Sequence, residues 1–301
     1  MMDPIVRKTT VALLVILVPV AVYHSTTILT FLMNATRSPF GYEHHANVQY
    51  GDAPAHRLDV YVPEAAVGAP VVILWHGGMW KQGSKDDVRF LGAALARLGY
   101  LTVIPNYRLY PEVRFPAFVD DGARAVAWVR KEIARLSGNP DAIFLMGHSA
   151  GAYIATMLVF DDRYLRQHGE SVKCIRGVIG MAGPYTLERP AVLLGSIFDK
   201  SSGNGWRPID VVSTAAPPTL LLHGEADNIV WVDEAKAMAV QLGRHAIPVD
   251  LRIYPNRSHY DVLVAWWWPL QFRAPVRHDV QRFIDREVAD SAPRAACVPG
   301  N

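Results

Sequence analysis

A serine flanked by glycines is the first feature of the sequence that could carry chemistry. Residues 147–151 read Gly-His-Ser-Ala-Gly, with Ser149 at the centre. Between a strand and a helix, this pattern makes a turn so sharp that the neighbouring positions must be small, and the serine then projects near the positive end of the helix. A strand-like apolar run, 142–146, precedes the motif, and a helical pattern, 150–160, follows it. We therefore predict that Ser149 is a nucleophile.

A serine nucleophile requires a base, and the base requires a carboxylate that orients it. Where the nucleophile lies on this kind of turn, the acid follows the serine along the chain and the histidine follows the acid. Asp227 lies in the loop after the apolar run 218–222, and His259 lies in the loop after the next run, 249–253. These positions predict a catalytic triad of Ser149, Asp227 and His259.

Other acids and histidines compete for these two roles. Glu225 is the nearest acid to Asp227, and we prefer Asp227 for its position in the loop. His245 precedes the strand that leads to His259, at the wrong end of the sheet, and His278 lies inside the closing helical pattern. The reading of His259 as an ordinary surface histidine stays open.

Two adjacent glycines provide the expected anion-binding loop. The apolar run 71–75 leads directly into His76-Gly77-Gly78. Acyl transfer produces an oxyanion, which backbone N–H groups stabilise when no side chains crowd them. Gly77 and Gly78 would supply such donors, and Ala150, next after the nucleophile, would complete the oxyanion hole. We expect His76 to hold the loop through a hydrogen bond and to take no part in the reaction.

Alternating strand and helix patterns must position these residues. Such alternation predicts an α/β fold, with a mostly parallel central sheet and helices on both faces. We expect the catalytic domain to cover residues 47–290, with a short cap insertion at about 185–214, where glycines and a proline interrupt the rhythm. The expected strands are 57–62, 71–75, 101–104, 142–146, 175–181, 218–222 and 249–253, and the expected helices are 86–98, 118–136, 150–160, 232–242 and 276–288.

The two ends of the chain differ from this domain. Residues 9–34 carry no charge and follow two basic residues, and a membrane span takes about 20 residues. We expect residues 1–36 to form an N-terminal hydrophobic helix that anchors the protein, with the catalytic domain outside the cytoplasm, in a bacterial periplasm. A cleaved signal peptide of a secreted protein and a buried helix are the alternatives. Residues 37–46 are expected to be a linker and 291–301 a flexible tail.

Composition excludes several classes of function. Half of the 301 residues are hydrophobic and the net charge is +2, so the chain is globular and shows no basic surface for nucleic acid. The two cysteines form no C-x-x-C pair, and His44 and His45 lack a third metal ligand nearby. We expect no metal and no organic cofactor. The sequence does not predict an oligomeric state.

Over roughly residues 45–290, the sequence resembles the α/β-hydrolase group of hormone-sensitive-lipase-like carboxylesterases and kynurenine-formamidase-like esterases. The His-Gly-Gly-x-Trp motif ending at Trp80 is closer to the formamidase-like branch, and residues 106–109, Asn-Tyr-Arg-Leu, resemble a D-Y-R-L segment of the group. Phe115-Pro116-Ala117 and Asp120, before a helix bearing Trp128, also match. The resemblance implies an α/β-hydrolase fold with the same triad and oxyanion hole.

The expected activity is hydrolysis of a small-molecule carboxylic ester through a covalent acyl-enzyme. Two alternatives stay open. One is an arylformamidase that cleaves an amide, and the other is a non-catalytic binding protein on the same fold.

Overall fold

The computed structural model describes residues 32–35, 40–187, 195–198 and 205–290. The chain divides into two units, Met1–Ser38 and Pro39–Asn301. In the first unit, residues 32–35 are helical, and the rest of the predicted N-terminal hydrophobic helix lies outside the described residues. Within the part of the chain that the structure describes, no helix is long and apolar enough to cross a membrane. The predicted tail, 291–301, also lies outside the described residues.

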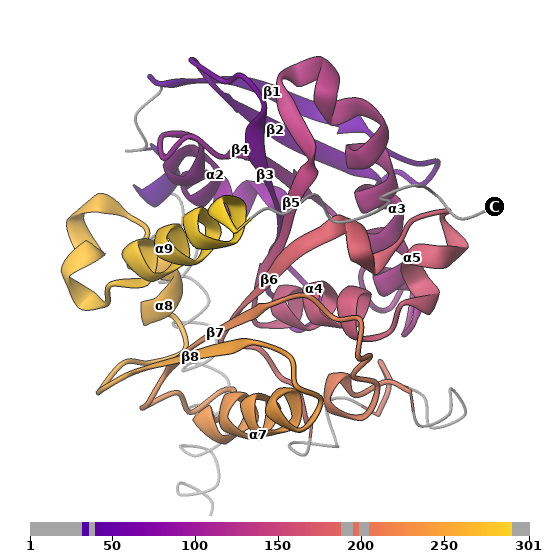
Figure 1. The fold of residues 1–301 in the computed structure, drawn as a ribbon, viewed down its shortest axis with the longest axis vertical. Helices are drawn as coiled ribbons and strands as arrows, with labels where there is room; N and C mark the ends of the chain where they lie inside the picture. Colours follow the sequence, from indigo (N-terminus) through magenta and orange to yellow (C-terminus); the bar gives the residue numbers. More distant parts are fainter. Residues whose placement is uncertain (1–31, 36–39, 188–194, 199–204, 291–301) are drawn as a thin grey trace, which may run out of the picture. The chain divides into compact units, whose positions relative to one another are not determined.

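A sheet of eight strands forms the centre of the second unit, in the order β1-β2-β4-β3-β5-β6-β7-β8 (Figure 1). Strand β2 is antiparallel to both of its neighbours, β1 and β4, whereas β3 to β8 all run parallel to one another. The predicted mostly parallel sheet is therefore confirmed. The strands are β1 Tyr42–Gln49, β2 Arg57–Pro63, β3 Ala69–Trp75, β4 Leu101–Pro105, β5 Gly138–His148, β6 Ile175–Met181, β7 Thr219–Gly224 and β8 Val249–Tyr254.

Strand β1 corrects the predicted linker 37–46 in its last residues, 42–46, whereas residues 37–39 lie outside the described residues. It begins at Tyr42 and pairs with β2 along most of its length. The ring of His44 stacks on Tyr61 with centroids 4.4 Å apart, and its Nε2 lies 3.0 Å from the Asp59 carboxylate. An edge strand needs no continuous apolar face, because one side remains open to water and polar residues protect the edge. The polar composition of β1 therefore gave no apolar pattern from which a strand could be predicted.

Helices cover both faces of the sheet, as predicted. In Figure 1, α2 and α9 lie on one face, and α3 and α4 lie on the other. The predicted helices over 86–98 and 118–136 each include a short 3₁₀ segment, Lys85–Val88 before α2 and Ile133–Leu136 after α3. The helices are α2 Arg89–Ala96, α3 Ala117–Glu132, α4 Ala150–Phe160, α5 Arg163–Gln167, α7 Val232–Arg244, α8 Asp261–Val264 and α9 Val276–Ala289.

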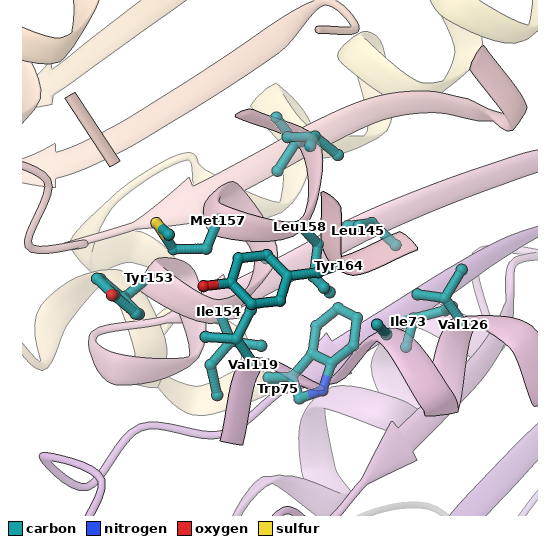
Figure 2. Close-up of a cluster of buried hydrophobic side chains, with 14 of the residues drawn as sticks. Ile73, Trp75, Val119, Val126, Leu145, Tyr153, Ile154, Met157, Leu158 and Tyr164 are labelled. Atoms are coloured by element: carbon teal, nitrogen blue, oxygen red, sulfur yellow. The ribbon is translucent and has the colours of Figure 1, made fainter. Parts of the chain in front are cut away.

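The main core lies between β3, β5 and the helices α3 and α4 (Figure 2). Helix α4 is apolar around its whole circumference, and every one of its residues is buried. Such a helix is stable only inside a protein, because no face of it can meet water without cost. Buried side chains of other elements, such as Trp75 and Val119, fill the space around it (Figure 2). The start of α4, which carries Ser149, is therefore held rigidly.

Candidate active site

The sharp turn at Ser149 is present between β5 and α4. Ser149 has φ 55° and ψ −120°, and its N–H donates to the carbonyl of Met181 at 2.9 Å. A Cβ on Gly151 would lie 2.1 Å from the carbonyl oxygen of Trp75, and one on Gly147 would lie 2.2 Å from the backbone of Gly151. Both flanking positions thus require glycine. A non-glycine residue at positive φ is strained, and such strain is found mainly at functional sites.

Asp227 and His259 lie together after β7 and β8. The Asp227 Oδ2 lies 2.7 Å from the Nδ1 of His259, and the Asp227 Oδ1 accepts the N–H groups of Ile229 and Val230, each at 2.9 Å. A carboxylate only accepts hydrogen bonds, so the Nδ1 of His259 carries the proton. In a neutral imidazole with its proton on Nδ1, the Nε2 atom bears a lone pair that can accept a proton.

His223, which sequence reasoning missed, is a second histidine on the same carboxylate. Its Nε2–H donates to the Val230 carbonyl at 2.8 Å and lies 3.2 Å from the Asp227 Oδ2. Burial alone would raise the pKa of Asp227, but the hydrogen bonds from His223 and His259 outweigh it and hold that pKa well below its usual range. Asp227 therefore stays charged. The signal in the sequence was a histidine at the end of the strand that leads to the acid.

His148 joins the serine turn to the loop of His259. Its Nε2–H donates to the carbonyl of His259 at 3.0 Å, and the two rings lie 4.7 Å apart. Burial, followed by the nearby His259, lowers the pKa of His148 to about 3. This ring is therefore neutral at physiological pH and serves as a fixed link between the residue before Ser149 and the histidine loop.

The glycine loop after β3 lies against the serine. A Cβ on Gly77 would lie 3.2 Å from the Cβ of Ser149, so the backbone of the loop is next to the nucleophile. As expected, His76 holds the loop, because its Nδ1–H donates to the Gly77 carbonyl at 2.7 Å. The hydroxyl of Tyr107 donates to the carbonyl of His76 at 3.0 Å, and the two rings stack. Burial lowers the pKa of His76 to about 4, so this ring is also neutral.

Gly78 gives the first testable prediction. It has φ +114°, and a Cβ there would lie 2.0 Å from the carbonyl oxygen of Gln82, so Gly78→Ala must displace the loop. Because displaced N–H groups no longer meet the oxyanion, we expect kcat for an ester to fall about 10²-fold or more with little change in KM. Gly99→Ala is the control, since Gly99 has φ +93° with nothing within 4 Å. It should cost stability but no activity. An increased KM at unchanged kcat would instead assign the loop to substrate binding.

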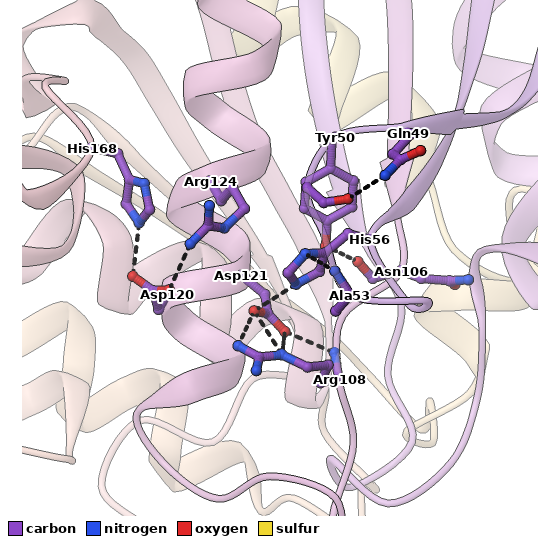
Figure 3. A network of polar contacts seen from close by, with 11 residues as sticks. Gln49, Tyr50, Ala53, His56, Asn106, Arg108, Asp120, Asp121, Arg124 and His168 are labelled. Atoms are coloured by element: carbon purple, nitrogen blue, oxygen red, sulfur yellow. Dashed lines mark hydrogen bonds and ion pairs between the residues drawn. The ribbon is translucent and has the colours of Figure 1, made fainter.

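An ion pair between Arg108 and the buried carboxylate of Asp121 holds the segment 106–109 (Figure 3). Asp121 of α3 is fully buried, and Arg108 donates to it from its side chain at 2.6 Å and from its backbone at 2.9 Å. His56 adds a bond at 2.9 Å. Because the Nδ1 of His56 accepts the N–H of Ala53 at 3.1 Å, its Nε2 is the protonated nitrogen that donates to Asp121.

The segment 106–109, which contributed to the family resemblance, supports the glycine loop. Immediately after it, the N–H of Tyr110 donates to the Trp80 carbonyl at 2.8 Å. At its start, the side-chain oxygen of Asn106 accepts the N–H of Lys85 at 2.6 Å. An asparagine oxygen accepts this bond as an aspartate oxygen would, so the departure from D-Y-R-L keeps the contact.

The described parts of the predicted cap, 185–187, 195–198 and 205–214, are joined to the rest of the unit by side chains. The carboxylate of Glu234, in the first turn of α7, accepts the N–H of Tyr185 and the hydroxyl of Thr186, each at 2.7 Å. A cavity of about 670 Å³ lies close to these hydrogen bonds. It is lined by Leu187, Gly205, Trp206, Arg207, Asp210 and Val211. Neither the predicted triad nor the glycine loop lines it, so we assign it no part in the chemistry.

The competing residues make other contacts or lie on other elements. Glu225 is exposed, and its carboxylate accepts the N–H of Asn256 at 3.3 Å. His245 follows the end of α7, and His278 is exposed on α9. Among the described residues, no group of three histidine, cysteine, aspartate or glutamate side chains is arranged to hold a metal ion.

Comparisons with known proteins identify the family and the fold of the chain. The BD-FAE family matches residues 58–242. An isoprenylcysteine alpha-carbonyl methylesterase of Arabidopsis thaliana is 29% identical over 258 residues, covering 78% of this chain and 60% of its own length. Esterase LipQ of Mycobacterium tuberculosis is 30% identical and covers 78% of this chain and 62% of its own length. The chain thus spans about 60% of the length of these curated relatives.

Solved structures show the same fold. Esterase B of Lactobacillus rhamnosis, inhibited by a tributyrin phosphonate, superposes with a TM-score of 0.77 at 19% identity, covering 96% of this chain and 97% of its own. An esterase of Pyrobaculum calidifontis superposes with a TM-score of 0.71 at 22% identity, covering 96% and 98%. With its mostly parallel sheet and its serine turn between β5 and α4, the chain has the α/β-hydrolase fold and belongs to the BD-FAE family.

Proposed function

We propose that this protein is a serine hydrolase that cleaves carboxylic esters of small molecules, with Ser149 as nucleophile, His259 as base and Asp227 as the orienting acid. The observation that carries the proposal is the bond of 2.7 Å between Asp227 and His259, because it fixes the tautomer that a base requires. The names of the relatives, which are esterases and methylesterases, support the same reaction class.

The reaction would take place in two steps. The Nε2 of His259 takes the proton of the Ser149 hydroxyl as its oxygen attacks the ester carbonyl, and the N–H groups of Gly77, Gly78 and Ala150 receive the oxyanion. His259 then gives its proton to the departing alcohol, which leaves an acyl group on Ser149. In the second step a water molecule, deprotonated by His259, attacks the acyl group. The bond to Ser149 breaks, His259 returns the proton to the Ser149 oxygen, and the carboxylic acid is released. Asp227 stays ionised and stabilises the protonated histidine throughout.

A fluorophosphonate probe and a substrate panel test this proposal against its two alternatives. We expect the probe to label the protein stoichiometrically at Ser149 and to block the hydrolysis of short-chain esters, because only an activated serine reacts with it. A non-catalytic binding protein would not be labelled. An arylformamidase would be labelled, but it would cleave N-formyl aromatic amines faster than esters. Faster formamide cleavage would therefore replace the ester assignment and keep the triad.

A further inference from the structure

Exposed apolar side chains are present on both of the loops that carry Asp227 and His259. Ile229 is 46% exposed, Trp231 is 47% exposed and Tyr260 is 43% exposed. Two of them follow Asp227 at the end of β7, and Tyr260 directly follows His259. We call these three residues the histidine-side patch. Single exposed apolar residues are common on proteins, but three on the loops of one candidate site are a reason to ask what they contact.

The Tyr260 ring lies directly against the candidate base. It meets the ring of His259 edge-on, with centroids 5.3 Å apart and planes at 84°, and it lies 6.3 Å from the ring of His148. The carbonyl of Tyr260 accepts the N–H groups of Leu263 and Val264, so the residue is fixed at the start of α8. One part of the ring therefore packs on the site while the rest is open to solvent.

The backbone positions of the other two residues are constrained by the loop of the acid. The N–H of Ile229 donates to Asp227 at 2.9 Å, which ties its backbone to the carboxylate that holds His259. Trp231 is the residue that precedes the first turn of α7. A patch built on such constrained positions loses little conformational freedom when a ligand covers it, which favours binding.

The reaction itself decides which part of an ester meets this patch. The carbonyl oxygen must point toward Gly77, Gly78 and Ala150, which lie on the β3 and β5 side of the sheet. The departing alcohol oxygen must lie at the Nε2 of His259, because that nitrogen supplies its proton. The alcohol group therefore extends over the side of the site where His259 and the patch lie.

We propose that the histidine-side patch is a subsite for the alcohol portion of the ester, and that the preferred substrates are esters of apolar or aromatic alcohols. The inference rests on the proposed function and adds the substrate class. The proposed subsite makes no statement about the acyl group, because the acyl group extends from the carbonyl carbon of the ester in a different direction from the alcohol oxygen.

Two isomeric esters separate the alcohol side from the acyl side. 2-Phenylethyl acetate carries its ring on the alcohol, and ethyl phenylacetate carries the same ring on the acyl group. We expect kcat/KM of the wild type to favour 2-phenylethyl acetate over both ethyl phenylacetate and ethyl acetate by about tenfold, the scale of discrimination that an apolar pocket gives. The two acetates form the same acetyl-enzyme, so a difference between them reports on the alcohol side alone.

Variants of the patch then test its role. Tyr260→Ala and Ile229→Ser should each lower the ratio of kcat/KM for 2-phenylethyl acetate to kcat/KM for ethyl acetate about tenfold. The ratio is the readout because both side chains lie beside the candidate site, so a general loss of activity would lower both values equally. Tyr260→Phe should keep the preference, since the ring and not the hydroxyl makes the contact. Val240→Ser is the matched control, because Val240 is 56% exposed on α7, outside these loops. Thermal unfolding confirms that each variant is folded.

Each outcome is distinguishable. Turnover of the acetates by the wild type without a preference, or an equal loss for both acetates in the folded patch variants, overturns the subsite and leaves the esterase assignment standing. A preference for ethyl phenylacetate that Tyr260→Ala reduces would move the acyl group to the patch and also overturns the inference. No turnover of any ester by the wild type overturns the proposed function, and the subsite with it.

Discussion

Replacement of Ser149 by alanine is expected to lower kcat for ester hydrolysis by roughly four orders of magnitude or more while the fold remains intact. The loss follows because no other group would form the acyl-enzyme. The fold should survive because Ser149 has φ 55°, a strained value that costs alanine and serine alike, and because its main link to β6 is a backbone bond to Met181. Ester turnover and thermal unfolding of the same preparation measure both effects.

Two further variants sharpen this test. Ser149→Gly should be equally inactive but at least as stable as the wild type, because glycine adopts positive φ without strain. Ser171→Ala removes a serine at the start of a surface 3₁₀ helix and should retain full activity. If purified Ser149→Ala kept most of the turnover, Ser149 would not be the nucleophile.

The parts of the fold and the site that could be predicted from sequence are those that short patterns encode. Buried parallel strands are continuous apolar runs, so β3, β5, β6 and β7 were visible as such. Ser149, Gly77 and Gly78 each come shortly after such a run. A sharp turn after a strand requires small residues, and these can be recognised in the sequence. The structure places these residues at the expected strand ends because the motif and its neighbouring strand are contiguous in the chain.

The remainder depends on contacts between distant segments, which no local pattern records. His148 and His259 are 111 positions apart, and their bond appears only when the loops after β5 and β8 meet. The resemblance pointed to Asp120, whereas the buried carboxylate that holds Arg108 is its neighbour Asp121. One position along a helix changes the direction of a side chain by about 100°, so which of two adjacent acids faces inward follows from packing.

Replacement of Asp227 by asparagine is expected to lower kcat/KM for esters about 10³–10⁴-fold and to cost about 1–3 kcal/mol of stability, because buried donors are then left without an acceptor. The Asp227 Oδ1 accepts two backbone N–H groups, and its Oδ2 faces the His259 Nδ1 and the His223 Nε2. The NH₂ group of an asparagine would face either the two backbone N–H groups or the two histidine nitrogens. In either orientation a donor faces another donor. If the NH₂ faces His259, the ring must move its proton to Nε2, and the nitrogen that should receive the serine proton is then occupied.

The matched control is the acid two residues earlier. Glu225→Gln changes a carboxylate on the same loop that is exposed and bonded to the backbone of Asn256, so kcat/KM should stay within about twofold of the wild type. Equal losses in the two variants, or a larger loss for Glu225→Gln, would remove Asp227 from the triad. Fluorophosphonate labelling rates add a second readout that does not depend on the choice of ester. Because labelling also requires an activated serine, the rate for Asp227→Asn should fall in parallel with kcat/KM, whereas a folding defect would lower the labelled fraction and leave the rate of the folded molecules unchanged.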